Sequence, residues 1–448
     1  MSGTRGDREQ ERGSAPELIL AGRALLNGRL QPVEIAIDGE GRIQSLGRVR
    51  TGAPRHDVGD AVILPAATDL HVHFREPGGD RGVESLATGT VQAALGGVTL
   101  VGDMPNNDPP IADLDALESK QRLVVGRAAV DVLLYATPTR AAALEPLSRA
   151  AGAFKIYLSP TTGIRETLPS AALGPLLERL AALGLPVTVH AEEPDRFGDR
   201  SPPRDPVDWN AHRPPEAETA AIDRLLTAPA GLRLHVAHVT LPSSVERLRA
   251  ARVSFEATPH HLLLHDRSGP DARFKVNPPL RSEADRRGLW EAFRRGEVPC
   301  VASDHAPHAP DRKELPFAKA PSGMPGVETL LPLLLARCRN GELELATLLR
   351  AACDRPARWL GQPLGRIAPG HRANLLVVDF KARTRLDGKR LHAPCGWTAF
   401  EGWEAIFPRE HYRDGRRIVE GGEYVGRPSG RLVRPEYAPS GGPRPPRR

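Results

Sequence analysis

Hydrophobic and polar positions follow two different rhythms along the chain. Between residues 17 and 64, short runs with strand-like alternation are separated by Asn-Gly and Asp-Gly turns. From Val62 onward, short apolar runs alternate with longer stretches rich in Ala and Leu, which is typical of repeated βα units. The first rhythm predicts a small β layer, and the second predicts a parallel sheet covered by helices.

Eight apolar runs fit the strands of a closed barrel. They lie at residues 62–74, 98–104, 132–137, 153–158, 186–190, 232–238, 253–258 and 298–304. A (β/α)8 barrel needs eight βα units, and its catalytic residues lie at the carboxyl ends of its strands. The predicted fold class is therefore α/β, with a (β/α)8 TIM-type barrel as the main body.

The segments outside the barrel divide the chain further. A strand pattern returns after the barrel, so we expect residues 17–64 and 365–425 to form one small β-sandwich domain. The barrel would then occupy residues 65–364. Residues 1–16 are polar without an apolar period, and residues 426–448 are rich in Pro and Arg, so both ends are predicted to be disordered.

Composition narrows the class of protein. The 448 residues include 43 Gly and 44 Pro, too few for a low-complexity chain, so a mostly disordered protein is excluded. Six arginines lie within residues 427–448, so most of the formal charge of +6 belongs to a solvated tail and no nucleic-acid partner is expected. No apolar stretch is long enough to cross a bilayer, and the four cysteines are scattered as in a reducing compartment. We therefore expect a cytoplasmic protein without a membrane partner.

Polar residues with a strong chemical signal fall at the ends of the expected barrel strands. In the first strand, alternation places His71 and His73 on one face, and two imidazoles spaced in this way can hold a divalent ion. In the fourth strand, Lys155 lies between two apolar residues, where an unpaired ammonium is costly to bury. Three later strands also end in polar residues: His190, His238 and Asp304.

Each of these residues also has an ordinary structural explanation. A core histidine with satisfied hydrogen bonds is more common than a metal ligand, and an Asp after a strand is often a helix cap. Taken together at one end of a barrel, they predict a metal site. Imidazole and carboxylate ligands without thiolate favour Zn²⁺ and leave Mn²⁺, Co²⁺ and Fe²⁺ open.

Several longer strings resemble the amidohydrolase superfamily and, within it, the dihydroorotases. They are residues 71–78 (HVHFREPG), 103–107 (DMPNN), 258–261 (TPHH), 275–280 (KVNPPL), 302–308 (ASDHAPH) and 321–329 (PSGMPGVET). The similarity runs from about residue 17 to 425. The chain departs from the family at Pro65-Ala66, where members usually carry Pro-Gly, and in the stretch between residues 395 and 424.

The resemblance implies a hydrolase that uses two divalent metal ions, with Zn²⁺ favoured. A water between the two ions would become the attacking hydroxide, and Asp304 would ligate the first ion and act as general base. Lysine carbamylated by CO₂ is an anion, which would resolve the cost of the buried ammonium. The ligands implied are His71 and His73 for the first ion, His190 and His238 for the second, and carbamylated Lys155 between both.

The reaction implied is the reversible hydrolysis of the cyclic amide of (S)-dihydroorotate to N-carbamoyl-L-aspartate, a step of pyrimidine biosynthesis. The resemblance assigns the substrate carboxylate to Arg75, Asn106 and His308, and the edge of the ring to Asn277. Arg75 suits a carboxylate because a guanidinium stays charged and binds with two parallel hydrogen bonds.

Two other functions stay open from the sequence. An allantoinase or a dihydropyrimidinase-like enzyme would share the metal site, but Arg75 favours a substrate with a carboxylate on its ring. A catalytically silent partner of aspartate carbamoyltransferase would have lost metal ligands, whereas all six candidates are present. An active homo-oligomer, with or without association with that transferase, is the expected assembly. His260 and His261 are left without a role.

Overall fold

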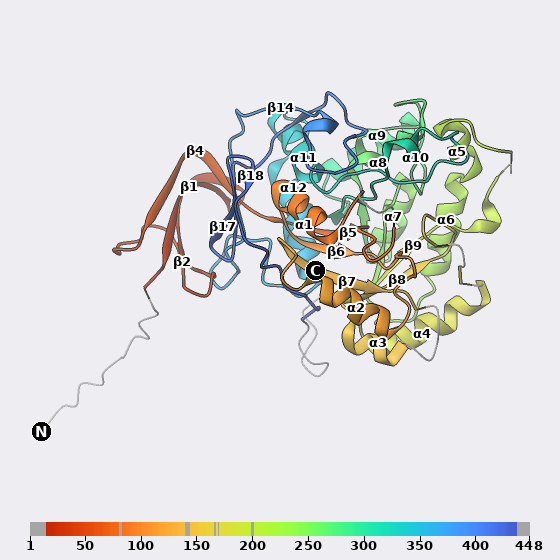
Figure 1. Cartoon of the computed structure of the whole chain (residues 1–448), viewed down its shortest axis with the longest axis horizontal. Helices are drawn as coiled ribbons and strands as arrows, with labels where there is room; N and C mark the ends of the chain where they lie inside the picture. The colour runs from red at the N-terminus through yellow and green to blue at the C-terminus, as the bar shows by residue number, and fades with distance from the viewer. Residues whose placement is uncertain are drawn as a thin grey trace, which may run out of the picture.

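A barrel lies beside a sheet that is built from both ends of the chain (Figure 1). The computed structural model describes residues 15–79, 83–138, 144–164, 167–168, 170–198 and 201–436. The tails expected to be disordered lie largely outside these ranges. No helix in the described part of the chain is long and apolar enough to cross a membrane.

Eight strands form the barrel, and each pairs with the next one along the chain. They are β5 Ala67–Val72, β6 Val98–Asp103, β7 Asp131–Ala136, β8 Ala153–Tyr157, β9 Val187–His190, β10 Leu234–Val236, β11 Ser254–Ala257 and β12 Cys300–Val301. The ring closes just beyond β12, where the His73 N–H donates to His305 O at 2.7 Å and Val72 forms a parallel bridge with His305. The predicted (β/α)8 barrel is confirmed.

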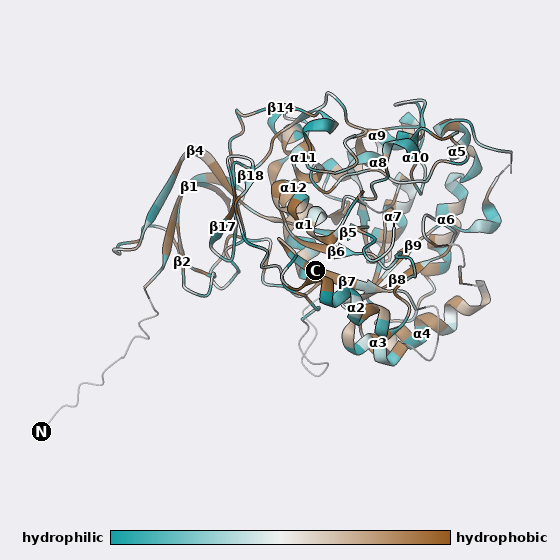
Figure 2. Cartoon of the chain, in the orientation of Figure 1, coloured by the Kyte–Doolittle hydropathy of each residue, from teal (hydrophilic) through white to brown (hydrophobic). Residues whose placement is uncertain are grey.

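Helices surround the barrel and bury apolar residues against its strands. Figure 2 shows the contrast between the hydrophobic strands near β6 and β7 and the hydrophilic helix α10 at the rim. The helices are α1 Leu86–Leu95, α2 Leu114–Val124, α3 Leu144–Ala150, α4 Leu173–Leu183, α5 Pro206–His212, α6 Pro215–Leu225, α7 Pro242–Ala250, α8 Pro259–Leu263, α9 Glu283–Arg294, α10 Pro310–Lys313, α11 Leu330–Arg339, α12 Leu345–Leu349 and α13 Arg355–Trp359.

A second eight-stranded sheet combines the two ends of the chain in the order β18-β17-β16-β13-β4-β1-β2-β3. Its strands are β1 Leu18–Leu26, β2 Arg29–Ile37, β3 Ile43–Leu46, β4 Arg55–Pro65, β13 Leu375–Val378, β16 Glu410–Arg413, β17 Arg416–Glu420 and β18 Glu423–Tyr424. Strand β4 joins the halves because it pairs with β1 on one side and with β13 on the other. A separate two-stranded sheet pairs β14 Thr384–Arg385 with β15 Glu404–Ala405.

Alternation along β4 and β13 gives this sheet two different buried faces. Ile63 and Leu375 belong to a core within the sheet domain. Leu64 and Leu376, their neighbours in sequence, point the other way and belong to the core of the barrel. The sheet domain is therefore attached to the barrel through a continuous apolar interface.

The structure corrects one predicted strand. The apolar run expected as a single strand at 62–74 is two strands, because β4 ends at Pro65 and β5 starts at Ala67. Proline has no N–H to continue a ladder, so the chain leaves the first sheet there. The N–H of Ala66 then donates to Asn374 O at 3.0 Å before the chain enters the barrel.

The structure also corrects the start of the C-terminal tail, which was predicted at residue 426. Leu432 forms a bridge with Val132 of β7, Val433 is buried, and the N–H of Glu436 donates to Leu360 O at 3.0 Å. The segment up to residue 436 therefore packs on the barrel. A composition rich in Pro and Arg hid the role of Val433, whose side chain is buried in an apolar core, whereas Leu432 is exposed and contributes its backbone bridge.

Asp131, at the start of β7, connects the barrel to the sheet domain through buried charges. Its carboxylate accepts hydrogen bonds from Arg372 at 2.5 Å and from Arg413 at 2.7 Å, and its side chain is fully buried. Arg372 also pairs with Asp414 at 2.6 Å, but loss of Asp131 removes the carboxylate that the two largely buried guanidinium groups share. We expect Asp131→Ala to lower the free energy of unfolding by about 3–5 kcal/mol, measured by urea denaturation.

The matched control is Asp223→Ala, which removes an exposed carboxylate paired with Arg247 on the surface. An exposed pair contributes little, so this variant should lose less than about 1 kcal/mol. Equal losses in the two variants would contradict the connecting role of Asp131.

Candidate active site

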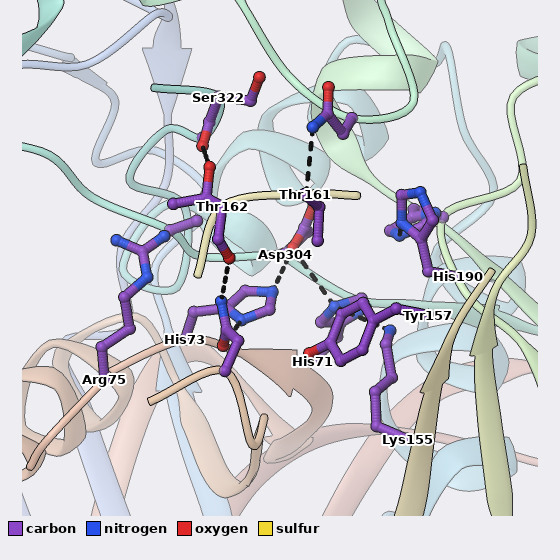
Figure 3. Close-up of a pocket in the computed structure, with 15 residues that line it drawn as sticks. His71, His73, Arg75, Lys155, Tyr157, Thr161, Thr162, His190, Asp304 and Ser322 are labelled. Carbon is purple, nitrogen blue, oxygen red and sulfur yellow. Dashed lines mark hydrogen bonds and ion pairs between the residues drawn. The ribbon is translucent and has the colours of Figure 1, made fainter. Parts of the chain in front are cut away.

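Buried polar side chains converge at the carboxyl ends of the barrel strands. Figure 3 shows Lys155 reaching toward His71 and Asp304 lying between His71 and His73. The structure thus brings together the residues predicted as metal ligands, all of them buried: His71, His73, Lys155, His190, His238 and Asp304.

Two groups of ligand atoms face one another in this cluster. Asp304 Oδ1 lies 3.0 Å from His73 Nε2 and 3.3 Å from His71 Nε2, and these three residues could hold one ion. On the other side, His190 Nδ1 lies 3.0 Å from His238 Nε2. Lys155 comes from the strand between the two groups, with its Nζ 3.4 Å from His71 Nε2.

The backbone turns sharply where three of the site residues leave their strands. Arg75, His238 and Asp304 have positive φ angles of 55°, 37° and 49°. Such angles are uncommon in residues other than glycine and cluster at functional sites, where the surrounding fold holds them in place. Their side chains line the same pocket.

Buried acids orient two of the histidines. Glu256 of β11 places Oε1 2.6 Å from His71 Nδ1 and Oε2 3.0 Å from His235 Nε2. Glu192 places Oε2 2.7 Å from His190 Nε2 and is itself paired with Arg213. A carboxylate on the outer ring nitrogen fixes the proton there and leaves the inner nitrogen free to bind a metal.

Burial favours the neutral form of three of the imidazoles. It lowers the pKa of His73 to about 4 and also lowers the pKa of His190 and of His238. Burial likewise lowers the pKa of Lys155 to about 8. For Asp304, burial alone would raise the pKa, but His71 and His73 outweigh it and hold the pKa well below its ordinary value.

This donor set fits divalent metal ions. Glu256 and Glu192 hold the protons of His71 and His190 on the outer ring nitrogens, so the inner nitrogens present lone pairs that a cation can bind. A site of imidazole nitrogens and one carboxylate, with no thiolate, is suited to Zn²⁺ and its neighbours among the transition metals.

The residues predicted to bind substrate are partly in the expected place. Arg75 is buried, lines the pocket and donates from Nη1 to Pro307 O at 2.9 Å. Asn277 also lines the pocket and donates to Thr161 Oγ1 at 3.1 Å. His308 instead faces a larger neighbouring cavity, into which Arg75 also extends, and its Nε2 lies 3.1 Å from Ser322 O.

Asn106 has a second task that the sequence did not reveal. Its Oδ1 lies 2.5 Å from His73 Nδ1, and its Nδ2 donates to Thr162 O at 3.0 Å. The side chain therefore orients His73 and fixes the loop after β8. Asn106 also lines the pocket.

Sequence reasoning missed several residues of the site. Glu256 lies between Phe255 and Ala257 in a buried strand, which is the same signal that identified Lys155. Tyr157 follows Lys155 by two residues, so alternation puts it on the same face, and it lines the pocket. His261, which had no predicted role, is structural: its Nε2 lies 3.0 Å from Pro278 O.

Comparison with known proteins identifies the class to which this site belongs. Residues 62–394 match the model of the amidohydrolase family. Curated relatives named "Dihydroorotase" include one from Halobacterium salinarum, 36% identical over 93% of this chain and 99% of its own length, and one from Thermoplasma volcanium, 35% identical over 93% and 97%.

Solved structures with a similar fold carry other names. An L-hydantoinase (dihydropyrimidinase) from Arthrobacter aurescens has a TM-score of 0.83 and 26% identity, covering 92% of this chain and 98% of its own. A dihydropyrimidinase from Brevibacillus agri has a TM-score of 0.84 and 25% identity, covering 94% and 99%.

The chain belongs to the amidohydrolase family and is a hydrolytic enzyme of that metal-dependent class. Within the family, its sequence groups with the dihydroorotases.

Glu256 provides a test of how the site holds metal. Glu256→Gln removes the anionic acceptor of His71 Nδ1, so the inner nitrogen becomes a weaker ligand. Loss of such an outer partner typically costs about 10- to 100-fold in metal affinity. We expect a decrease of that size when Zn²⁺ binding is measured in competition with a chelator.

Glu283→Gln on α9 is the control, because this carboxylate is exposed and is not among the residues that line the pocket. It should bind Zn²⁺ as the unmodified protein does. Unchanged affinity in Glu256→Gln would show that the acid does not support the metal ligand.

Proposed function

We propose that the chain is a dihydroorotase that hydrolyses the cyclic amide of (S)-dihydroorotate to N-carbamoyl-L-aspartate and catalyses the reverse ring closure in pyrimidine biosynthesis. The observation that carries the proposal is Arg75, a buried guanidinium in the wall of the histidine pocket. The substrate of such a pocket should be a small cyclic amide that carries a carboxylate. The names of the curated relatives agree with that chemistry.

Two divalent ions, with Zn²⁺ favoured, fit the cluster. When bound, they would supply Lewis acidity, which lowers the pKa of a water and polarises the amide carbonyl. The proposed ligands are His71, His73 and Asp304 for one ion, His190 and His238 for the other, and Lys155 between them.

Lys155 would act in this site as a carbamate formed with CO₂. Carbamylation requires a neutral amine, and burial lowers the pKa of Lys155 to about 8, so a fraction of the side chain is neutral near physiological pH. The carbamate replaces the buried ammonium of Lys155 by an anion. An anion at this position can bind the metal ions that the neighbouring side chains would hold.

Asp304 is the proposed general base and acid. Its pKa stays well below the ordinary value, so it is ionised and can take a proton from the attacking water. The same oxygen atoms lie at the centre of the pocket, from which they can return the proton to the departing ring nitrogen. Arg75, Asn106 and His308 would hold the carboxylate, and Asn277 the edge of the ring.

The competing activity is that of the hydantoinases and dihydropyrimidinases, which share the fold. Dihydrouracil and hydantoin carry no ring carboxylate, so they cannot form the ion pair with Arg75 that dihydroorotate would form. A catalytically silent protein is disfavoured because all six proposed ligands converge in one pocket.

A panel of three substrates tests the proposal. Purified protein supplied with Zn²⁺ and bicarbonate should open the ring of L-dihydroorotate, followed by loss of absorbance, and should leave dihydrouracil and allantoin intact. Preferential turnover of dihydrouracil or allantoin would move the assignment to the competing activity. If protein with bound metal turns over none of the three substrates, the result would favour a catalytically silent protein.

We propose that the chain forms a homo-oligomer and that it is located in the cytoplasm. The four cysteines are free, as expected in a reducing compartment. Association with aspartate carbamoyltransferase is included because that enzyme makes the compound that the reverse reaction would cyclise. Light scattering of the purified chain and co-purification from cell extract test the two statements separately.

Replacing Arg75 tests the substrate pocket. Arg75→Ala removes the cation that would pair with the carboxylate, and truncating one partner of a buried charged pair costs about 2–5 kcal/mol. We expect kcat/KM for L-dihydroorotate to fall by at least about 30-fold. Arg312→Ala is the control, since Arg312 is exposed at the rim of the neighbouring cavity. Full activity in Arg75→Ala would refute the role assigned to Arg75.

A further inference from the structure

One wall of the pocket is a backbone segment, residues 317–323, which we call the strap. Ser322 and Gly323 of the strap line the pocket. The carbonyl of Ser322 accepts a hydrogen bond from Thr162 Oγ1 at 2.9 Å and lies 3.1 Å from His308 Nε2. A single carbonyl therefore connects the loop after β8 with a residue proposed to bind the substrate.

Two lysine side chains hold the strap on either side of Ser322. Lys275 Nζ donates to Phe317 O at 2.7 Å and to Ala320 O at 2.8 Å. Lys313 Nζ donates to Pro321 O at 2.9 Å and to Gly323 O at 2.8 Å. Both lysine residues are buried. The carbonyls next to Ser322 are thus tied to side chains from outside the strap.

Neither ammonium has a carboxylate within ion-pair distance in the part of the chain that the structure describes. The nearest compensating groups beside the carbonyls are aromatic rings, with Trp209 centred 4.7 Å from Lys275 Nζ and Trp397 5.6 Å from Lys313 Nζ. Burial lowers the pKa of Lys275 to about 8 and that of Lys313 to about 7. Asp271 acts on Lys313 only as a more distant charge. Two buried amines without an ion pair are an expensive way to stabilise a loop, which favours a functional reason for them.

The strap is also pressed against the segment that carries His308. Gly323 has a φ of 134°, and a Cβ placed there would lie 2.5 Å from Ala306 O and 3.2 Å from His308 Nε2. The N–H of Gly323 donates to Lys275 O at 2.9 Å. Without side-chain bulk at this position, the backbone can approach closely, and the lysines keep it there.

We infer that Lys275 and Lys313 are positioning residues that set substrate affinity by fixing the Ser322 carbonyl, and through it His308 and Thr162. The inference rests on the proposed function for the identity of the substrate. Neither ammonium is among the groups that line the histidine pocket, so the lysines should act on binding more than on the chemical step.

Lys313→Met tests the inference, because methionine keeps most of the length and apolar surface of lysine but cannot donate to Pro321 O or Gly323 O. KM for L-dihydroorotate should rise by about tenfold or more, since two buried carbonyls lose their donor. The kcat should change by less than about threefold, and bound Zn²⁺ should stay at the level of the unmodified protein. Amide hydrogen exchange in the strap should become faster.

Lys319→Met is the matched control, because Lys319 belongs to the same strap but is exposed. It should leave KM and hydrogen exchange unchanged. Lys313→Gln, which keeps an uncharged N–H donor group on a shorter side chain, should give an intermediate KM, and it also serves if the methionine variant does not fold.

The outcomes separate the inference from the proposed function. Unchanged KM and unchanged exchange in both Lys313 variants would overturn the positioning role. A fall in kcat together with loss of bound Zn²⁺ would also overturn it, because the lysine would then support the whole site. If the unmodified protein does not turn over L-dihydroorotate, the proposed function fails, and hydrogen exchange still decides whether Lys313 fixes the strap.

Discussion

The structure of the site depends on one constraint. The lone pairs of buried imidazole nitrogens need a hydrogen-bond donor or a cation. His190 Nδ1 and His238 Nε2 lie 3.0 Å apart, and His71 Nε2 lies 3.3 Å from Asp304 Oδ1. Burial lowers the pKa of His190 and of His238, so these two rings cannot repay their desolvation by charge. Divalent cations would resolve this cost, which agrees with the metal-dependent class to which the chain belongs.

The surrounding fold maintains that arrangement through several layers of buried charge. Glu256 and Glu192 orient the rings from outside the pocket, and Arg213 neutralises Glu192. Farther out, Lys120 pairs with Asp103 at 2.9 Å, and the same carboxylate accepts the N–H of Phe74 at 3.1 Å. This pair secures the end of the first barrel strand, so the position of His73 depends on contacts well beyond the metal ligands.

Much of the barrel and the convergence of the proposed metal ligands could be predicted because strand alternation is a local property. Alternation alone put His71 and His73 on one face and pointed Lys155 inward. Contacts between distant segments could not be read in the same way. The bond of Asn106 to His73 and the position of His308 against Ser322 depend on how separate loops meet. The strap could not be identified from the sequence because backbone carbonyls, which every residue possesses, accept its hydrogen bonds.

The number of metal ions needed for turnover tests the central claim most directly. Protein stripped with a chelator should be titrated with Zn²⁺ in the presence of bicarbonate while the ring opening of L-dihydroorotate is followed. Two facing groups of ligands predict that activity rises until two ions are bound per chain, and that it stays low when bicarbonate is withheld during reconstitution. Full turnover by the stripped protein, or saturation at one ion per chain regardless of bicarbonate, would contradict a two-metal site bridged by Lys155.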